Sequence, residues 1–335
     1  MSSLTPLRVR LSGVGTYLPE QRVTNQQLAS RLGIDAHWIE ATTGVVERRY
    51  VSDTDTTVGM ASAAAKEAIG NAGVQADELD AIIFAAISRQ QLIPCTAVFI
   101  QRALRCTEGR SFCFDVDATC LSWMVGLHTA SLFIAAGRCQ CALVVSSEMA
   151  SRSLEPRQPE SAVLFGDAAA AAVIRPSGAG EVSCLNHALF ETHNSGAELT
   201  QFKGAGTAHH PNDPLTRPKM NRFHMDGPAI FKLARRLAPP FIERFLDEAG
   251  TRRSDYDVVV VHQASIMGVR ALTRHLGFSH DQVITNLAQR GNTIAASIPL
   301  LLSEAIASGR IERGQRVLML GTGAGLSLGA MDLVF

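Results

Sequence analysis

The chain has 335 residues, of which 46% are hydrophobic and 19% are charged, so it can bury a large core and is not a disordered polymer. Lys and Arg total 31, as do Asp and Glu, and this balance gives no global reason to expect a nucleic acid or an anionic membrane as partner. The N-terminal residues lack a signal-peptide pattern, and the seven cysteines match no zinc-binding spacing. We therefore expect a cytoplasmic protein with reduced thiols and no bound metal.

Short apolar strands alternate along the chain with Ala-rich helices, which predicts an α/β fold with sheets covered on both faces. The expected elements are, in chain order, a helix at 58–72, a strand at 81–86, a helix at 121–136, strands at 142–145 and 258–261, a helix at 297–308 and a strand at 317–320. The apolar segment 121–136 is too short to cross a membrane, and we expect a helix buried on all sides.

The sequence repeats itself weakly. Segment 72–80 precedes one apolar strand as segment 249–257 precedes another, an offset of 177 residues, and the segments around Gln140 and Gln315 match at an offset of 175. These matches favour a duplicated unit, with an N-terminal half at 1–178 and a C-terminal half at 179–335. Chance similarity between α/β segments is the alternative.

Three side chains suited to acyl transfer lie at the ends of predicted elements. Cys120 precedes an apolar helix, whose N-terminal N–H groups favour a thiolate. His262 follows an apolar strand, and Asn292 lies in a glycine-led turn before another helix. A lone cysteine is usually a packing residue, but a nucleophile, an imidazole and an amide donor together make up a thiol acyl-transfer site. Asn292 is the repeat mate of position 117, so a pseudo-dyad would bring its turn beside the cysteine turn.

These motifs resemble the thiolase superfamily, specifically the ketoacyl-ACP synthase III group of condensing enzymes. The matching segments, spread over the whole chain, are 43–49, 115–120, 165–170, 262–264, 291–299 and 321–329. The resemblance implies a duplicated five-layer α-β-α-β-α fold and a homodimer. It also implies no cofactor, since CoA or phosphopantetheine thioesters are the substrates.

The resemblance implies a role for each site residue. Cys120 would take an acyl group from an acyl-CoA or acyl carrier protein. His262 and Asn292 would stabilise the enolate that forms as a malonyl or other β-ketoacyl thioester loses CO2. The backbone N–H groups of Cys120 and Ala324 would bind the oxyanion, with Ala324 standing where the family has glycine. The product would enter fatty-acid or secondary-metabolite synthesis, including polyketide synthesis.

The resemblance also gives a set of residues for substrate binding, namely Trp38, Ile93, Phe165, Gly227 and Ser265. The chain departs from the family near these positions. Pro159 and Thr42 stand where arginines are usual, and Pro228 replaces an asparagine that contacts pantetheine. In this family the position before Pro94 reaches across the dimer to the floor of the partner's acyl pocket; here it is Ile93, which is smaller than the phenylalanine of short-primer enzymes. We therefore expect weak CoA binding and a preference for acyl donors longer than acetyl.

Lys232, Arg270 and Arg274 lie at helical spacing and are expected to dock an acidic carrier protein; ordinary solvated helix faces are the alternative. Two other functions remain open within this fold. One is an acyltransferase to a hydroxyl or amine, although such relatives commonly lack the asparagine. The other is a subunit of a heteromeric condensing complex. A biosynthetic thiolase is disfavoured because segment 321–329 contains no second cysteine.

Overall fold

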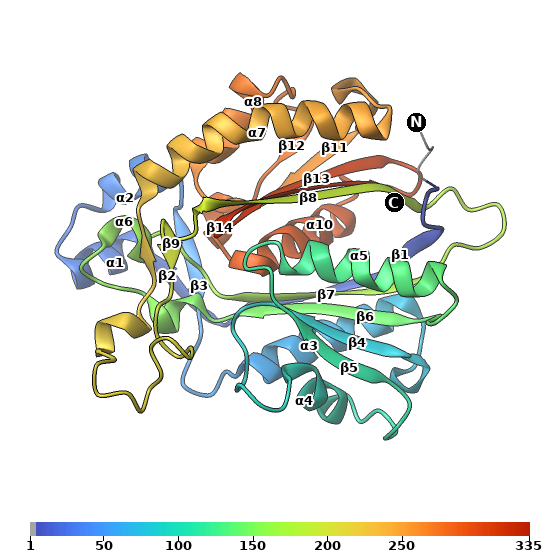
Figure 1. Cartoon of the computed structure of the whole chain (residues 1–335), viewed down its shortest axis with the longest axis horizontal. Coiled ribbons are helices and arrows are strands. Elements are labelled where there is room, and N and C mark those ends of the chain that lie inside the picture. Colours follow the sequence, from blue (N-terminus) through green and yellow to red (C-terminus); the bar gives the residue numbers. More distant parts are fainter. Residues whose placement is uncertain (1–4) are drawn as a thin grey trace.

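The computed structural model describes residues 5–335, apart from the side chains of residues 271–275. Two five-stranded mixed sheets form its framework (Figure 1). The first sheet has the order β1-β7-β6-β4-β5, with strands β1 (Val9–Tyr17), β4 (Ala81–Ala85), β5 (Phe112–Val116), β6 (Ala142–Glu148) and β7 (Ala168–Pro176). The second has the order β8-β14-β13-β11-β12, with strands β8 (Cys184–Gly196), β11 (Val258–Val261), β12 (Val283–Ile284), β13 (Arg316–Gly323) and β14 (Gly325–Val334).

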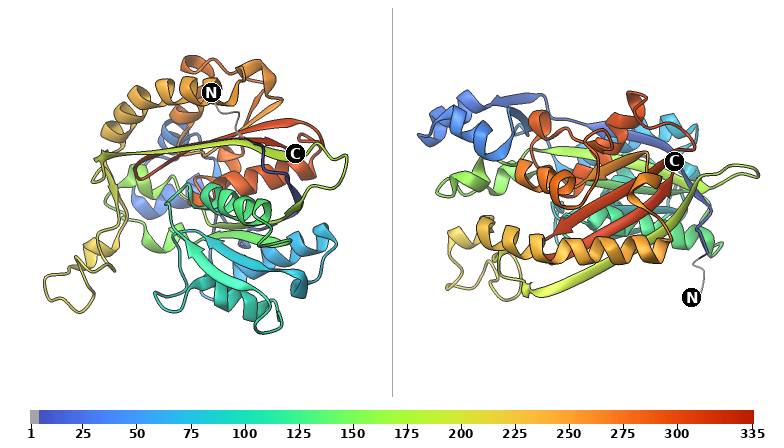
Figure 2. Two further views of the ribbon diagram at one scale, coloured as in Figure 1. Left: turned by 45° about the vertical axis from the view of Figure 1, so that its right-hand side comes forward. Right: turned by 90° about the horizontal axis from the view of Figure 1, so that it is seen from above.

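Three pairs of helices complete five layers (Figures 1 and 2). Between the sheets lie α5 (Ser122–Ala135) and α10 (Ser297–Ala307); α3 (Thr57–Ala72) and α4 (Thr96–Ala103) cover the outer face of the first sheet, and α7 (Gly227–Ala249) and α8 (Ile266–His275) cover that of the second. The largest hydrophobic cluster joins the inner faces of both sheets to both central helices, with Trp123 of α5 1% exposed. The predicted five-layer fold is confirmed.

The two halves repeat each other in detail. Before β4, Gly73 ends a helix at φ 64°, and before β11, Gly250 ends another at the same φ. The Asp80 carboxylate then accepts from the backbone N–H of Cys141 at 3.0 Å, and that of Asp257 accepts from the N–H of Arg316 at 2.7 Å. These matching contacts support the duplication that the sequence suggests. The division at residues 178 and 179, between β7 and β8, stays a prediction.

The central helix α5 differs from its prediction. Its first turns are buried between the sheets, but its last turn reaches the surface, where Leu132 is 46% exposed. The expectation that the segment is buried on all sides is therefore wrong. The sequence shows an apolar run, which does not reveal which of its side chains the folded chain leaves exposed.

Smaller elements gather at one end of the sheets, on the left in Figure 1. They are β2 (Gln21–Thr24), α1 (Asn25–Leu32), α2 (Ala36–Thr43), β3 (Glu47–Tyr50), α6 (Pro159–Ala162) and β9 (Thr200–Gln201). β10 (His224–Met225) pairs with β9, and α9 (Leu287–Arg290) packs against β3. Among the described residues, no helix has the length and apolar character needed to cross a membrane.

Candidate active site

The predicted nucleophile lies in a tightly fixed turn between β5 and α5. Asp117 begins the turn, where its Oδ1 atom accepts a hydrogen bond from the backbone N–H of Thr119 at 3.1 Å. Thr119 has a left-handed φ of 52°, and the half-buried Cys120 follows it directly. The Ser122 hydroxyl accepts from the N–H of Ala118 at 2.9 Å. These bonds place Cys120 at the N-terminal end of α5, where the sequence predicts it.

The turn of Asn292 has the same construction. Its Oδ1 atom accepts from the backbone N–H of Ile294 at 2.9 Å, and Ile294 has a left-handed φ of 51°. A short 3-10 turn, η5 (Ile294–Ala296), then leads into α10. Asn292 is 4% exposed, and its backbone pairs with the segment around Phe165. A β-branched residue with positive φ is strained and is often found at functional sites.

His262 follows β11, and its backbone N–H donates to the carbonyl of Leu320 on β13 at 2.8 Å. Burial lowers the pKa of the imidazole to about 4, so His262 is neutral at neutral pH. Its Nδ1 atom is buried and finds no hydrogen-bond partner in the part of the chain that the structure describes. A neutral imidazole can serve as a hydrogen-bond donor or as a proton acceptor, depending on its tautomer.

The glycine-rich end of β13 brings these turns together. Gly323 lies so close to the cysteine turn that an added Cβ atom would be 2.5 Å from Oγ1 of Thr119. The strand that carries Gly323 also pairs with β11, which His262 follows directly. Ala324 follows in the connection to β14. Figure 1 shows the N-terminal ends of α5 and α10 meeting between the two sheets.

Glu148, at the end of β6, is a site residue that the sequence analysis missed. It is fully buried and accepts hydrogen bonds from the backbone N–H groups of Ile87 (3.1 Å), Ser88 (3.2 Å) and Ala295, and from the Ser88 hydroxyl (2.6 Å). Burial raises its pKa to about 7. Burial and the nearby Glu148 carboxylate together raise the pKa of Cys120 to about 12. The resting thiol is therefore protonated at neutral pH, contrary to the thiolate that its place before a helix predicts. A lone acidic residue at the end of an apolar strand is the signal that could have identified it.

The predicted substrate residues fall into different surroundings. Phe165 is buried, packs edge-on against Phe223 with ring centroids 4.9 Å apart, and pairs with Asn292. Gly227 lines a cavity of about 520 Å³ at the start of α7. The Ser265 hydroxyl caps α8 by accepting from the N–H of Gly268 at 3.2 Å.

Trp38 and Ile93 lie apart from that cavity's lining. Trp38 packs against a small hydrophobic cluster that contains Ile39 and Val163. Ile93 is 83% exposed and precedes Pro94. Of the predicted docking residues, Lys232 is exposed on α7 and Arg270 is exposed on α8, while the side chain of Arg274 lies outside the described residues.

The N-terminal motif 43–49 has a structural role. The Thr43 hydroxyl donates to the carbonyl of Ile39 at 2.7 Å, and Gly44 ends α2 in a left-handed conformation. Arg48 is fully buried, and its guanidinium donates to Asn25 Oδ1 at 2.7 Å and to the carbonyl of Val163 at 2.6 Å. These bonds fasten the small helices to the segment that precedes Phe165.

The duplicated five-layer fold defines a thiolase-fold protein. It places a thiol, an imidazole and an amide at neighbouring element ends, where the sequence predicts an acyl-transfer site. A model of the 3-oxoacyl-[acyl-carrier-protein] synthase III family matches residues 114–192, and a model of that family's C-terminal region matches residues 246–335. The β-ketoacyl-[acyl-carrier-protein] synthase III of Neisseria meningitidis serogroup A is 34% identical over 326 residues, which cover 97% of this chain and 99% of that protein.

Solved structures agree with the sequence matches. The 3-oxoacyl-[acyl-carrier-protein] synthase III of Aquifex aeolicus has a TM-score of 0.88 at 32% identity, covering 98% of this chain and 100% of that one. The priming β-ketosynthase of the R1128 polyketide pathway has a TM-score of 0.88 at 28% identity, covering 98% and 96%. The chain belongs to the 3-oxoacyl-[acyl-carrier-protein] synthase III family, and it is an acyl-thioester condensing enzyme of the acyltransferase class.

Proposed function

We propose that the chain loads an acyl group onto Cys120 and condenses it, with loss of CO2, with a malonyl or other β-ketoacyl thioester. The product would serve fatty-acid or secondary-metabolite synthesis. The observation that carries this assignment is the pair of matching turns, which start the two central helices and hold Cys120 and Asn292. No metal or cofactor enters the proposed reaction.

Acyl loading begins with a protonated thiol, because the pKa of Cys120 is about 12. Its proton must leave as the sulfur attacks the thioester carbonyl of the donor. His262 is unprotonated at neutral pH and can accept that proton, and the N-terminus of α5 stabilises the developing negative charge. The carbon–sulfur bond of the donor then breaks, and the free CoA or carrier thiol takes the proton. Cys120 now holds the acyl group.

Condensation uses the two neutral donors. The carbon–carbon bond to the malonyl carboxylate breaks, CO2 leaves, and the remaining thioester becomes an enolate. Neutral His262 and the NH2 group of Asn292 would donate hydrogen bonds to the enolate oxygen. These bonds would stabilise its negative charge, which has no water to solvate it in a buried site. The enolate carbon attacks the acyl group on Cys120, and the backbone N–H groups of Cys120 and Ala324 bind the resulting oxyanion. Its collapse releases the β-ketoacyl product and leaves Cys120 as a thiolate, which takes up one proton from water to restore the thiol.

The cavity at Gly227 supports a donor presented by a carrier protein. Its lining includes the acidic residues Glu160, Glu198 and Asp226, and none of the described residues that line it is Lys or Arg. Phosphate groups of CoA would meet negative charge there. Exposed Lys232 and Arg270, on the neighbouring helices α7 and α8, are our proposed docking residues, together with Arg274.

We also assign a homodimer. β5 is an edge strand of the first sheet, and exposed apolar side chains cluster on and near it: Phe112 is 64% exposed, Leu92 68% and Ile93 83%. Exposed apolar side chains beside an unpaired strand edge suit pairing with a second copy. In that dimer Ile93 would reach the acyl pocket of the partner subunit. A cytoplasmic location remains our prediction.

Product analysis tests this function. The chain is incubated with an acyl thioester and a malonyl-carrier thioester labelled in its free carboxylate. We expect labelled CO2 and a β-ketoacyl product in equal amounts. Acyl transfer to a hydroxyl or amine acceptor without CO2 release would instead support the acyltransferase. Activity that appears only after a second protein is added would support a heteromeric complex.

A further inference from the structure

A chain of buried side chains connects the residue after His262 with the segment before Asn292. Gln263 is fully buried, and its Oε1 atom accepts from the backbone N–H groups of Asn286 at 3.0 Å and Leu287 at 2.8 Å. The Thr285 hydroxyl also donates to this oxygen. Gln263, which lies two residues past the end of β11, therefore caps the start of α9.

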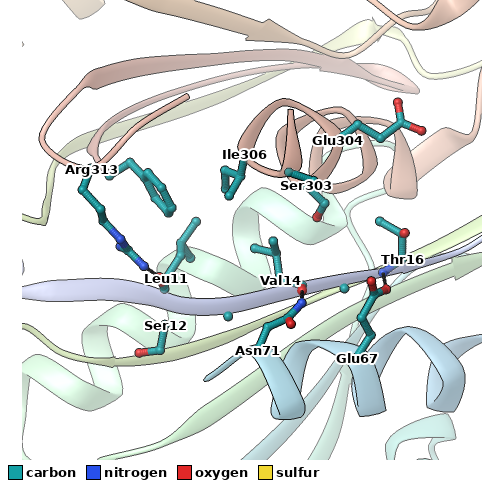
Figure 3. Close-up of a pocket in the computed structure, with 14 residues that line it drawn as sticks. Leu11, Ser12, Val14, Thr16, Glu67, Asn71, Ser303, Glu304, Ile306 and Arg313 are labelled. Atoms are coloured by element: carbon teal, nitrogen blue, oxygen red, sulfur yellow. Dashed lines mark hydrogen bonds between the residues drawn. The ribbon is translucent and has the colours of Figure 1, made fainter. Parts of the chain in front are cut away.

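The connection continues to the end of the same helix. Gln263 Nε2 donates to Asn286 Oδ1 at 2.6 Å, and Asn286 Nδ2 donates to Glu304 Oε2 at 2.7 Å. Glu304 Oε1 accepts from Arg290 Nε at 2.8 Å. Figure 3 shows the Glu304 carboxyl group on α10 pointing away from β1. We call these four residues, Gln263, Asn286, Glu304 and Arg290, the side-chain relay.

The relay matters because α9 is short. It spans only Leu287–Arg290, and an isolated helix of one turn is unstable. Its position therefore depends on contacts with its surroundings: the Ala288 carbonyl accepts from the backbone N–H of Val46 at 2.8 Å, and the side-chain relay holds the two ends. Asn292 lies two residues past the second end. Gln263 holds the first end and is covalently joined to His262.

We propose that Gln263 is a positioning residue that sets the place of Asn292 relative to His262 through the side-chain relay. This inference rests on the proposed function, because it concerns the two residues assigned to the enolate. Loading of Cys120 requires no contribution from Asn292. A displaced relay should therefore slow condensation and leave loading largely unchanged.

The direction of each hydrogen bond supplies a sharp test. In Gln263→Glu, the group facing Asn286 Oδ1 becomes an oxygen that cannot donate. The Asn286 amide can rotate by 180° so that its NH2 group donates to the new carboxylate. Its oxygen then faces the Glu304 carboxylate, and two acceptors cannot form a hydrogen bond. Adding Glu304→Gln replaces that carboxylate with an amide, whose NH2 can donate to Asn286 and whose oxygen can still accept from Arg290. The double variant thus restores the relay with its direction reversed.

The experiment compares Gln263→Glu, Glu304→Gln and the double variant in the full chain, with Glu312→Gln as an exposed control. Cys120 acylation is followed by mass spectrometry, condensation by kcat for β-ketoacyl product, and folding by Tm. We expect each single variant to load normally but to lose at least about tenfold in condensation kcat. The double variant should recover most of that loss.

Three results would overturn the relay: unchanged condensation in both single variants, no recovery in the double variant, or equal losses in loading and condensation with a lowered Tm. Glu304 is only half-buried, so we expect the Glu304→Gln protein to fold. It therefore tests the relay even if Gln263→Glu unfolds. Absence of both loading and condensation in the wild-type protein would refute the proposed function itself, which is a distinguishable outcome.

Discussion

Thr119 and Ile294, 175 residues apart, hold the same left-handed backbone conformation, with φ of 52° and 51°. The backbone N–H of each residue donates to a side-chain oxygen two positions earlier. The acceptor is Asp117 in the first half and Asn292 in the second. The two copies of the turn thus present different residues: the one after the left-handed residue in the first half, and the capping residue in the second. In the first half the next residue is Cys120, whereas in the second it is Ala295, and the capping residue Asn292 itself lies in the site. Since the turn occupies the Asn292 oxygen, we expect its NH2 group to be the one that meets the substrate.

Gly323→Ala should disturb the cysteine turn. The added Cβ atom would lie 2.5 Å from Thr119 Oγ1 and 3.2 Å from the carbonyl of Ala118, so the turn must shift. We expect slower acylation of Cys120, measured by quenched-flow mass spectrometry. The control is Gly70→Ala in α3, where no atom lies within 4 Å of the added methyl. That variant should acylate normally and gain roughly 0.5–1 kcal/mol of unfolding free energy. Equal acylation rates in both variants would contradict the account.

Asn292→Asp separates the turn from the chemistry. An aspartate keeps the oxygen that accepts from Ile294, as Asp117 does for Thr119, but it lacks the NH2 donor. We expect Cys120 loading close to that of the wild type and a condensation barrier higher by about 2–4 kcal/mol. Asn292→Ala should show the same loss of condensation together with a lower Tm. Unchanged product formation in either variant would point to the acyltransferase.

Glu148 should make stability depend on pH. Its pKa rises on burial from 4.5 to about 7, so the folded state binds its proton more tightly than the unfolded state. The stabilisation is complete below about pH 4.5 and is lost as pH rises through about 7. Glu148→Gln cannot ionise. The free energy of unfolding of the wild type should therefore fall relative to that of this variant between pH 5 and pH 8, by at most roughly 3 kcal/mol.

Denaturant titrations of both proteins at the two pH values measure this difference. Asp167, whose pKa burial also raises, is present in both proteins and cancels in the comparison. A parallel pH dependence of the two proteins would show that Glu148 does not titrate in this range.

Ile93→Phe should shorten the preferred acyl donor. In the proposed dimer a larger side chain at this exposed position would fill part of the partner subunit's pocket. Each methylene that no longer fits costs about 0.8 kcal/mol. The measurement is kcat/KM for acetyl, hexanoyl and decanoyl thioesters on CoA and on carrier protein. Val182→Phe, at an exposed apolar site between β7 and β8, is the control. A wild-type preference for acetyl-CoA would refute the expectation that the acyl pocket accepts chains longer than acetyl.

Local sequence was enough to predict β11 at Val258–Val261, the repeat offset and the turns of Cys120 and Asn292, because strand periodicity and glycine-led turns are short-range signals. It did not reveal Glu148 or the partners of Gln263. Those residues depend on contacts across 61 and 23 positions, which only the folded topology brings together. The exposure of Leu132 was missed for the same reason, since an apolar run does not show which of its side chains other elements will bury.

Covalent loading of Cys120 tests the central claim most directly. The wild type, Cys120→Ala and Cys184→Ala are incubated with a panel of acyl-CoA and acyl-carrier thioesters, digested, and mapped by mass spectrometry. All seven cysteines are free, so each can report by its own mass shift. We predict one acyl group on Cys120 in the wild type and in Cys184→Ala, and neither acylation nor turnover in folded Cys120→Ala. Normal turnover by the folded Cys120→Ala protein, or acylation at another cysteine instead, would contradict the account.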